Sequence, residues 1–383
     1  MAKVLVGLSG GVDSAVCAYL LKQQGHDVTC LFMRNWDSAL NNDQLGNPTL
    51  NKPICPQEMD YNDAKKVAEA LSLPLLRVDF IKEYWDYVFS SFLDDYKLGR
   101  TPNPDILCNK YIKFQSFFDY AMNHGFDYVA TGHYAQVEHF DNYSIMKKGI
   151  DTNKDQSYFL CQVAQKALHK TLFPLGDIDK AKVREIAHEL NLPIADKKDS
   201  TGICFIGERN FKEFLSNYLP SFDGDVIDIA SKKVIHRHGG VLYYTVGQRK
   251  GLGIGGAGGP WVVVGKNVFK NELYVVNQKD DYWLYSDECH VSQLNWFNPM
   301  DFSKPIECMA KFRYRQQDHP VTITMMENGQ LSITYPQKIA SVAIGQEAVF
   351  YQNDVCLGGG CIDATFINNE NLVDLLESKL QSI

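Results

Sequence analysis

The chain has 383 residues, of which 45% are hydrophobic, and a formal net charge of −8. This length predicts two or three domains, with enough apolar residues for several cores. The negative charge excludes indiscriminate nucleic-acid binding, although it leaves room for a local basic patch that contacts RNA.

The first residues run directly into an expected strand, without the basic and apolar regions of a signal peptide. No apolar stretch approaches the ~18 residues that a membrane helix needs. We therefore expect a cytoplasmic protein with no membrane partner. In that compartment its ten cysteines act as core residues or reactive thiols rather than as a disulfide framework. The cysteine and histidine spacings predict no metal site in the protein itself.

Strands and helices alternate over the first third of the chain. The expected elements are strand Val4–Leu8, helix Asp13–Gln24, strand Val28–Met33, helix Tyr61–Leu71, strand Leu75–Phe80, helix Ile81–Leu98, helix Cys108–Asn123 and strand Tyr128–Thr131. This alternation predicts an α/β domain with a doubly wound parallel sheet, whose ligands bind beyond the carboxyl ends of the strands. Residues Asn35–Glu58 interrupt the pattern and predict a long surface loop.

The pattern changes in the second half of the chain. A helix at Lys180–Leu190 is expected to close the α/β part, and short β-rich runs separated by Gly, Asn and Asp follow after about Asp225. These runs predict a small central module and a C-terminal domain that resembles a β-barrel. The predicted domain bounds are 1–209, 210–282 and 283–383.

The hexapeptide Ser9-Gly10-Gly11-Val12-Asp13-Ser14 lies between the first strand and the first helix. Its glycines permit a tight turn, and the N–H groups that open the helix can hold an anion such as pyrophosphate. It lacks the Gly-Lys-[Ser/Thr] ending that suits transfer of a γ-phosphoryl group. The hexapeptide resembles the PP-loop of ATP pyrophosphatases, which adenylate a substrate oxygen and release pyrophosphate. That group includes amidating synthetases and RNA-thiolating enzymes, so the loop does not identify the acceptor.

Two cysteines are candidates for sulfur chemistry. We expect Asp105 to be the N-cap of a helix that carries Cys108 in its first turn, where a thiol has a lowered pKa. The alternative is that Cys108 is a small apolar residue facing the sheet. Cys204 lies between glycines and near Lys197, Lys198 and Arg209, which also predicts a lowered pKa. If the two thiols meet at one crevice, one can carry sulfur as a persulfide and the other can attack it.

Several ordered blocks carry a resemblance to a known family. They are Asn103-Pro104-Asp105 with Cys108-Asn109, Ala130-Thr131-Gly132-His133-Tyr134, Asp155-Gln156-Ser157-Tyr158-Phe159-Leu160, Arg313-Tyr314-Arg315-Gln316 and the segment around Cys204. In these blocks the chain resembles the tRNA-specific 2-thiouridylase family over essentially its whole length. It departs from the family at Tyr111, where an acidic residue is expected, and in the longer Asn35–Glu58 loop.

The resemblance implies that ATP, with Mg²⁺, adenylates the oxygen on C2 of the wobble uridine, and that sulfur then displaces AMP to give 2-thiouridine. It implies that Cys204 bears a persulfide delivered by a donor protein, either a cysteine desulfurase or a sulfur-relay protein. Cys108 then acts as the nucleophile and a disulfide remains, while Asp105 or Asp13 assists through Mg²⁺ or as a base. The implied ATP-binding residues are Gly7, Leu8, Ser9, Gly10, Gly11, Val12, Asp13, Ser14, Met33 and Gly132.

The implied partner is tRNA, with the acceptors for Lys, Glu and Gln. The resemblance places Asn103, Pro104 and Asp105 at the target base. It gives further tRNA contacts to His133, Lys154, Asp155, Gln156, Arg313, Tyr314 and Gln346. Independently, residues 311–315 alternate basic and aromatic side chains with the period of a strand, which predicts three basic residues on one face. A single basic cluster is nevertheless more often a solvated surface than an RNA site.

Two alternatives remain open at this point. An amidating synthetase with the same loop would pass nitrogen to its acceptor and would tolerate loss of Cys204. An RNA-binding module whose ATPase loop only gates binding would tolerate alanine at both Cys108 and Cys204. Within the sulfur-transfer hypothesis, direct attack by the persulfide and release of free sulfide are also both open.

Overall fold

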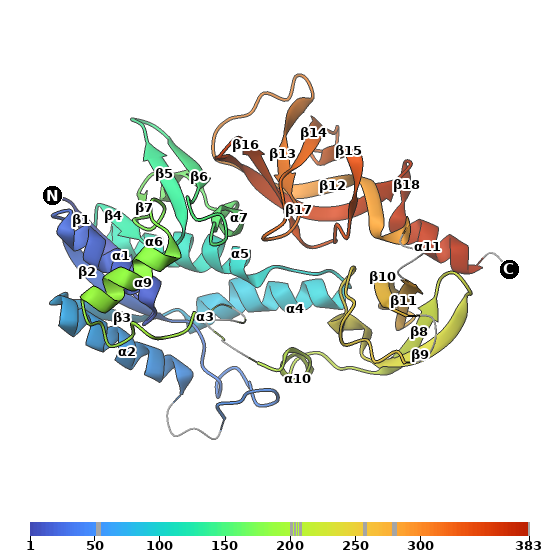
Figure 1. The fold of residues 1–383 in the computed structure, drawn as a ribbon, viewed down its shortest axis with the longest axis horizontal. Helices are drawn as coiled ribbons and strands as arrows, with labels where there is room; N and C mark the ends of the chain where they lie inside the picture. The colour runs from blue at the N-terminus through green and yellow to red at the C-terminus, as the bar shows by residue number, and fades with distance from the viewer. Residues whose placement is uncertain are drawn as a thin grey trace.

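The computed structural model describes residues 1–50, 55–199, 202, 204, 206, 209–255, 259–277 and 282–381. It contains an α/β domain, a small four-stranded sheet and an antiparallel barrel, which follow one another along the chain (Figure 1). Within these ranges no helix combines the length and the apolar composition that crossing a bilayer requires.

The first domain is built on a five-stranded parallel sheet of order β3-β2-β1-β4-β7. Its strands are β1 (Lys3–Gly7), β2 (Asp27–Arg34), β3 (Leu75–Asp79), β4 (Tyr128–Ala130) and β7 (Thr171–Leu172). Alternate residues of β1 face opposite sides: Val4 and Val6 belong to one apolar core and Leu5 to another. The doubly wound parallel sheet that the sequence predicts is therefore confirmed.

Helices cover both faces of this sheet. One face carries α1 (Val12–Gln23), α2 (Pro56–Leu71) and α9 (Lys180–Glu189). The other carries α3 (Ile81–Tyr84), η1 (Trp85–Phe89), α4 (Ser90–Lys97), α5 (Pro104–Cys108), η2 (Asn109–Ser116) and α6 (Phe117–Asn123). The segments η1 and η2 are π-helical. Each expected long helix on this face is therefore interrupted, and the second begins four residues earlier than expected, at Pro104.

The loop that follows β2 is not simply a surface loop, as the sequence predicted. Trp36 and Asp43 are buried, and the indole Nε1 of Trp36 donates to Asp43 Oδ2 at 3.0 Å. Asp43 also pairs with Arg209 at 2.8 Å, which ties this loop to the segment that follows Cys204. The part of the expected loop at residues 51–54 lies outside the described residues.

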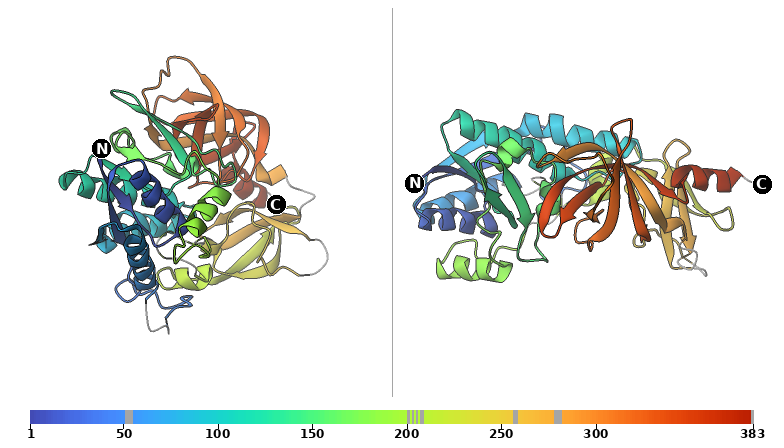
Figure 2. Two further views of the ribbon diagram at one scale, coloured as in Figure 1. Left: turned by 60° about the vertical axis from the view of Figure 1, so that its left-hand side comes forward. Right: turned by 90° about the horizontal axis from the view of Figure 1, so that it is seen from above.

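The central module contains β8 (Asp223–Asp228), β9 (Lys233–Gly239), the short 3-10 helix η3 (Val241–Tyr243), β10 (Trp261–Asn267) and β11 (Glu272–Asn277), in the sheet order β10-β11-β8-β9. The short helices α7 (Ser157–Leu160), α8 (Gln165–Leu168) and α10 (Phe211–Ser216) lie in the connections before it. Figure 2 shows this module beside the C-terminal barrel, at the far end of the molecule from the N-terminus.

The barrel strands are β12 (Tyr285–Trp296), β13 (Ile306–Lys311), β14 (His319–Met325), β15 (Leu331–Ala340), β16 (Glu347–Gln352) and β17 (Val355–Ile367), followed by β18 (Glu370–Asn371) and α11 (Leu372–Gln381). The barrel closes because β12 pairs with both β15 and β17. The hairpin β5 (Ala135–His139) and β6 (Ser144–Lys148) of the first domain adds to this sheet, with Lys147 opposite Val355. The sequence did not predict this hairpin, which joins the first domain to the barrel.

The predicted strand across residues 311–315 is wrong. The strand β13 ends at Lys311, and a turn follows in which Arg315 has a φ of +63°. Ala310 and Phe312 both lie in the barrel core, and the chain turns after Phe312. Lys311, Arg313 and Arg315 therefore do not share one face of a strand.

Candidate active site

The predicted phosphate loop joins β1 to α1 in the expected strand–turn–helix arrangement. Gly10 has a φ of +76°, and a Cβ atom there would lie 2.3 Å from the carbonyl oxygen of Asp60. Gly11 is the N-cap of α1 and brings no capping side chain to the helix terminus. The first-turn N–H groups thus remain available for an anion, with the helix dipole behind them.

Two lysines flank this loop. The ammonium group of Lys180 lies 2.6 Å from Asp13 Oδ1, which also accepts a hydrogen bond from the Tyr134 hydroxyl at 2.7 Å. Lys197 donates to the carbonyl oxygen of Gly10 at 3.0 Å. The sequence did not indicate either lysine as a nucleotide ligand. Lys180 begins α9 and Lys197 follows that helix, so both are far from the loop along the chain.

The other predicted nucleotide residues also lie at the carboxyl edge of the sheet. A Cβ atom at Gly7 would approach the Met33 methyl group to 3.2 Å, and one at Gly132 would approach the backbone of Asp13 to 2.9 Å. Gly132 thus allows the end of β4 to pack directly on the first turn of α1. The Gly7–Ser14 loop, Met33 and Gly132 occupy one continuous edge, as expected.

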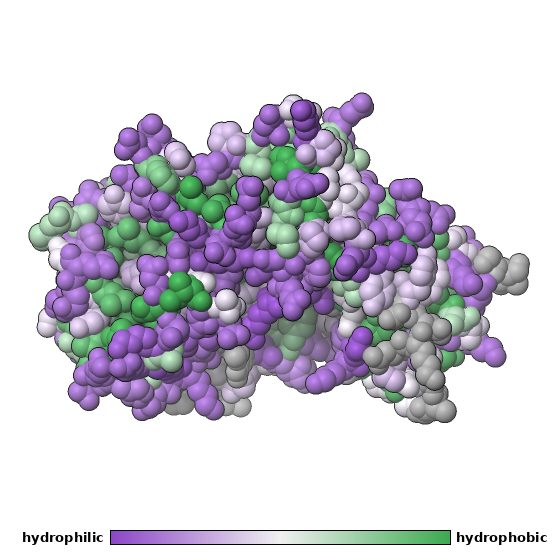
Figure 3. All heavy atoms as spheres, turned by 45° about the horizontal axis from the view of Figure 1, so that its top comes forward, coloured by the Kyte–Doolittle hydropathy of each residue, from purple (hydrophilic) through white to green (hydrophobic). Residues whose placement is uncertain are grey.

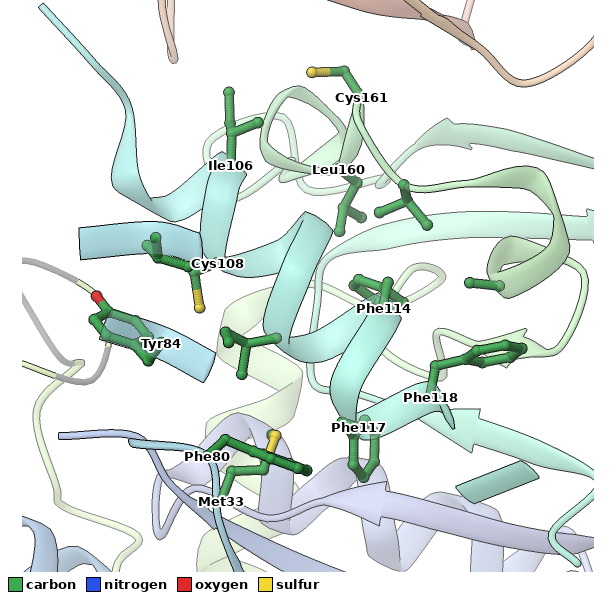
Figure 4. Close-up of a cluster of buried hydrophobic side chains, with 14 of the residues drawn as sticks. Met33, Phe80, Tyr84, Ile106, Cys108, Phe114, Phe117, Phe118, Leu160 and Cys161 are labelled. Carbon is green, nitrogen blue, oxygen red and sulfur yellow. The ribbon is translucent and has the colours of Figure 1, made fainter. Parts of the chain in front are cut away.

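Cys108 and Cys204 come together in the tertiary structure, with their sulfur atoms 3.6 Å apart. Cys108 is fully buried and Cys204 is partly exposed. Figure 4 shows Cys108 beside Tyr84, and Cys161 on the opposite side of the helix, pointing away. The fold therefore selects one cysteine partner for Cys204.

The backbone of Cys204 is held at both ends. Its N–H group donates to Asp105 Oδ1 at 3.2 Å, and its carbonyl oxygen accepts from the Tyr84 hydroxyl at 2.8 Å. Asp105 precedes Cys108 by one turn of α5, so both lie on the same face of that helix. Asp105 therefore positions Cys204 rather than capping the helix. The N-cap is Asn103, whose side chain accepts from Asp105 N.

The two thiols differ in their affinity for a proton. Burial raises the pKa of Cys108 well above its ordinary value, which corrects the expectation of a low-pKa thiol in a first helical turn. Cys108 is the fifth residue of α5, beyond that turn. A hydrogen bond from Cys108 lowers the pKa of Cys204, and Lys113 lowers it further. Cys204 therefore loses its proton more readily than Cys108 does.

The predicted tRNA residues fall into two groups. The first group contains Asn103, Pro104 and Gln346. Gln346 Nε2 donates to the Thr101 carbonyl at 2.6 Å, and Thr101 lies two residues before Asn103, the N-cap of α5. Arg313 donates to the carbonyl of Val246 at 2.8 Å. The Tyr314 ring lies 4.3 Å from that of Phe159, so Tyr314 links the barrel to α7 beside η2.

The remaining predicted contacts are engaged within the protein. Asp155 is buried and accepts from Gly149 N and from Ser157, and Gln156 accepts from Tyr134 N. Lys154 pairs with Asp199 at 2.6 Å. His133 is buried, and burial together with Lys113 lowers its pKa well below the ordinary value. These contacts favour structural roles for Asp155, Gln156 and His133.

Family profiles match most of the chain. Residues 2–208 match the tRNA methyl transferase HUP domain, 212–277 the tRNA methyl transferase PRC-barrel domain, and 286–362 the aminomethyltransferase beta-barrel domain. The tRNA-specific 2-thiouridylase MnmA of Mycoplasma capricolum subsp. capricolum is 55% identical over 371 residues, which cover 94% of this chain and 98% of that protein. The chain belongs to the tRNA-specific 2-thiouridylase family.

Other members of the 2-thiouridylase family are similar over the same length. Those of Mycoplasmopsis pulmonis and Staphylococcus aureus (strain JH9) are each 52% identical, and each alignment covers 97% of this chain. The alignments cover 99% of the Mycoplasmopsis pulmonis protein and 97% of the Staphylococcus aureus protein. The chain is thus an enzyme of the 2-thiouridylase type, and its HUP domain with a PP-loop implies that it uses ATP. A solved "4-thiouridine synthetase - RNA complex with bound ATP" aligns with a TM-score of 0.31 and 14% identity over 54% of this chain and 46% of that one, which is too weak to carry an argument.

Proposed function

We propose that this enzyme adenylates the C2 oxygen of the wobble uridine in tRNA and replaces that oxygen with sulfur from a protein persulfide. The observation that carries the proposal is the 3.6 Å separation of the Cys108 and Cys204 sulfur atoms, in the domain that holds the PP-loop. An adenylating loop alone fits many acceptors, whereas an adenylating loop with two adjacent thiols fits sulfur transfer.

In the first stage the uridine O2 atom attacks the α-phosphorus of ATP, and pyrophosphate leaves. The N-terminus of α1 has no capping side chain, so it suits the binding of the pyrophosphate group. The turn before it requires glycine at position 10, because a side chain there would collide with the Asp60 carbonyl. Lys180 and Lys197 lie beside this loop, where Lys180 contacts Asp13 and Lys197 donates to the Gly10 carbonyl. The Met33 side of the sheet edge is left for the adenosine.

Asp13 is the acidic side chain of the loop itself, and it would hold Mg²⁺ together with phosphate oxygens and water. The ion would neutralise phosphate charge during adenylation. The described part of the chain contains no group of three acidic, His or Cys side chains suited to a metal ion. This composition fits an ion that arrives with the nucleotide rather than one held by the protein alone.

In the second stage a sulfur atom from the Cys204 persulfide displaces AMP from C2. In one route Cys108 thiolate attacks the Cys204 sulfur and releases hydrosulfide, which then attacks C2. In the other route the outer persulfide sulfur attacks C2 first, and Cys108 then attacks the Cys204 sulfur and frees the thiocarbonyl. Both routes yield 2-thiouridine, AMP and a Cys108–Cys204 disulfide. A dithiol or another cellular thiol must then reduce that disulfide.

The unequal pKa values suit these roles. The lowered pKa of Cys204 makes it the better nucleophile toward the persulfide of a donor protein, and the raised pKa of Cys108 keeps that thiol in reserve. The donor is proposed to be a cysteine desulfurase or a sulfur-relay protein. The proposed acceptors are the tRNAs for Lys, Glu and Gln, and the proposed compartment is the cytoplasm.

The test is nucleoside mass spectrometry of tRNA incubated with ATP, Mg²⁺ and either a cysteine desulfurase with cysteine or free sulfide. With the protein donor, wild type should form 2-thiouridine and Cys108→Ser and Cys204→Ser should not. Free sulfide should partly rescue Cys204→Ser. Cys55→Ser, at a partly exposed cysteine outside the pair, is the matched control and should retain activity.

The same experiment separates the alternatives. Unchanged product from the Cys108→Ser/Cys204→Ser double variant would refute the thiol roles. Methylated nucleoside in the presence of S-adenosylmethionine would instead support the methyltransferase wording of the family profiles. With isotope-labelled persulfide, dilution of the label by added unlabelled sulfide would indicate the route through free hydrosulfide.

A further inference from the structure

The helix that carries Cys108 changes its pitch directly after the cysteine. Residues Asn109–Ser116 are π-helical, so each N–H group bonds to a carbonyl five residues earlier and residues five apart lie nearly above one another. In an α-helix Lys113 would be rotated from Cys108 by roughly 140°. The π-helical turn instead brings Lys113 toward the face that carries Asp105 and Cys108.

Lys113 is held in place from the end of β4. Its ammonium nitrogen lies 3.3 Å from His133 Nε2, and His133 Nδ1 lies 2.7 Å from the hydroxyl of Thr131. Burial and the charge of Lys113 keep His133 neutral by lowering its pKa. A neutral imidazole accepts from Lys113 at Nε2 only when Nδ1 carries the proton, which then donates to Thr131. These contacts therefore fix the tautomer that anchors the lysine.

The ionisable groups that face the thiol pair come from several elements. Asp105 belongs to α5, Tyr84 to α3 and Lys113 to η2. Both thiols act on Tyr84 and Lys113, while Asp105 is acted on by Lys113 and by the backbone N–H group of Cys204. Among the described residues, Lys113 is the one cation whose charge acts on both thiols. Burial opposes protonation of Lys113, but Cys204, Cys108 and Asp105 outweigh it and raise its pKa.

Two of the three cations that the sequence placed near Cys204 are paired with other carboxylates. Lys197 pairs with Asp60 and Asp63, and Arg209 pairs with Asp43. In the described part of the chain, neither Lys197 nor Arg209 acts on the two thiols, whereas Lys113 acts on both. Lys113 is in position to stabilise a buried anionic sulfur.

We propose that Lys113 is a positioning residue for sulfur transfer, which holds the Cys204 sulfur as an anion while the His133–Thr131 pair holds Lys113. The Cys204 thiolate attacks the outer sulfur of a donor persulfide, R–S–SH, and R–S⁻ leaves, so that Cys204–S–SH forms without net oxidation. Lys113 then faces the newly bound sulfur when that sulfur loses its proton. His133 is the anchor of this lysine rather than a tRNA contact.

This inference depends on the proposed function for its purpose, but the pKa of Cys204 is measured without tRNA or ATP. The measurement is the rate at which iodoacetamide alkylates Cys204, followed by peptide mass spectrometry as a function of pH. In Lys113→Met the midpoint of the pH profile of Cys204 alkylation should rise by about one pH unit or more. Alkylation of Cys204 near neutral pH should then be about tenfold slower. Lys113→Arg keeps the charge and should recover most of the shift.

Lys110→Met is the matched control, because Lys110 lies on the same helix but donates to Gln162 at 3.1 Å. Its Cys204 midpoint should equal that of wild type. His133→Leu removes the anchor without removing the charge, and should raise the midpoint by less than Lys113→Met does. If Lys113→Met fails to fold, as judged by its thermal transition, Lys113→Gln and His133→Leu decide the question.

A second measurement uses glutathione persulfide as the probe. Lys113→Met should load less persulfide onto Cys204 at neutral pH and as much as wild type at high pH. An unchanged Cys204 midpoint in a folded Lys113 variant would overturn the inference. A wild type with the expected pH profile that makes no 2-thiouridine would instead refute the proposed function and leave this inference standing.

Discussion

The sulfur atoms of Cys108 and Cys204 lie 3.6 Å apart, although 96 residues separate the two cysteines along the chain. A disulfide bond is about 2.05 Å long, so small side-chain movements suffice to join them. The same pair contains one thiol that keeps its proton and one that loses it readily.

Mild oxidation should therefore form one internal disulfide. With one equivalent of diamide, non-reducing peptide mapping should detect a cross-link between the peptides of Cys108 and Cys204, because the pKa of Cys204 is lowered and Cys108 lies in contact with it. Cys161 is the control, since it is buried on the other side of the helix. Cross-links that involve Cys161, or none at all, would contradict the arrangement.

Gly10→Ala should abolish ATP binding measured by calorimetry. Gly10 has a φ of +76°, and the added Cβ would lie 2.3 Å from the Asp60 carbonyl, so the loop must shift. Gly25→Ala is the matched control: its φ is +82°, but nothing lies within 4 Å of the added atom. The control carries only the conformational strain of about 1–2 kcal/mol and should bind ATP as wild type does. Equal ATP affinity for both variants would count against the phosphate cradle.

Asp43→Ala should destabilise the first domain by about 3–5 kcal/mol, because it leaves the buried guanidinium of Arg209 without its carboxylate. Urea unfolding followed by Trp fluorescence measures this, since Trp36 contacts Asp43 directly. The control is Lys97→Ala, which removes a solvent-exposed pair with Asp94 and should cost about 0.2–1 kcal/mol. Similar losses for the two variants would show that burial of the Asp43 pair contributes little.

Glu347 should make the protein less stable as the pH rises. Burial raises the pKa of Glu347 to about 7 from an ordinary value of 4.5, so the folded state binds the proton more tightly than the unfolded state. Stability contributed by the protonated form is full below pH 4.5 and is lost as the pH rises to about 7. The loss amounts to about 3 kcal/mol.

The matched comparison is the free energy of unfolding at pH 5 and pH 8. Glu347→Gln should flatten the difference between the two conditions, because the amide has no proton to lose. Glu307→Gln, at an exposed position of β13, should leave it unchanged. A wild-type profile that Glu347→Gln does not alter would contradict a raised pKa at this site.

Prediction from sequence succeeded where the signal is local. The alternation of strands and helices predicted the doubly wound sheet, because each strand carries its own apolar pattern. It failed for the hairpin β5–β6, since β6 is stabilised by pairing with β17 of a distant domain. It also failed at Lys311–Arg315, where β13 ends and the chain turns although the alternation of side chains suits a strand.

The surface shows a further limit of composition. Hydrophilic residues gather across the middle of the face drawn in Figure 3, where hydrophobic residues form smaller separate groups. The structure pairs the predicted tRNA contact Lys154 with Asp199, and it also pairs Lys148 with Asp318. A count of lysines and arginines thus overstates the charge that is available to RNA.

The sequence by itself determined the phosphate loop, since a positive φ at Gly10 and a helix N-terminus without a capping side chain are properties of consecutive residues. It also determined the family, because ordered blocks extend along the whole chain. Only the tertiary structure decided which of the two cysteines has the lowered pKa. The pKa of a thiol depends on burial and nearby charge, and here the charges and contacts come from Lys113, Asp105 and the partner sulfur, which folding brings together.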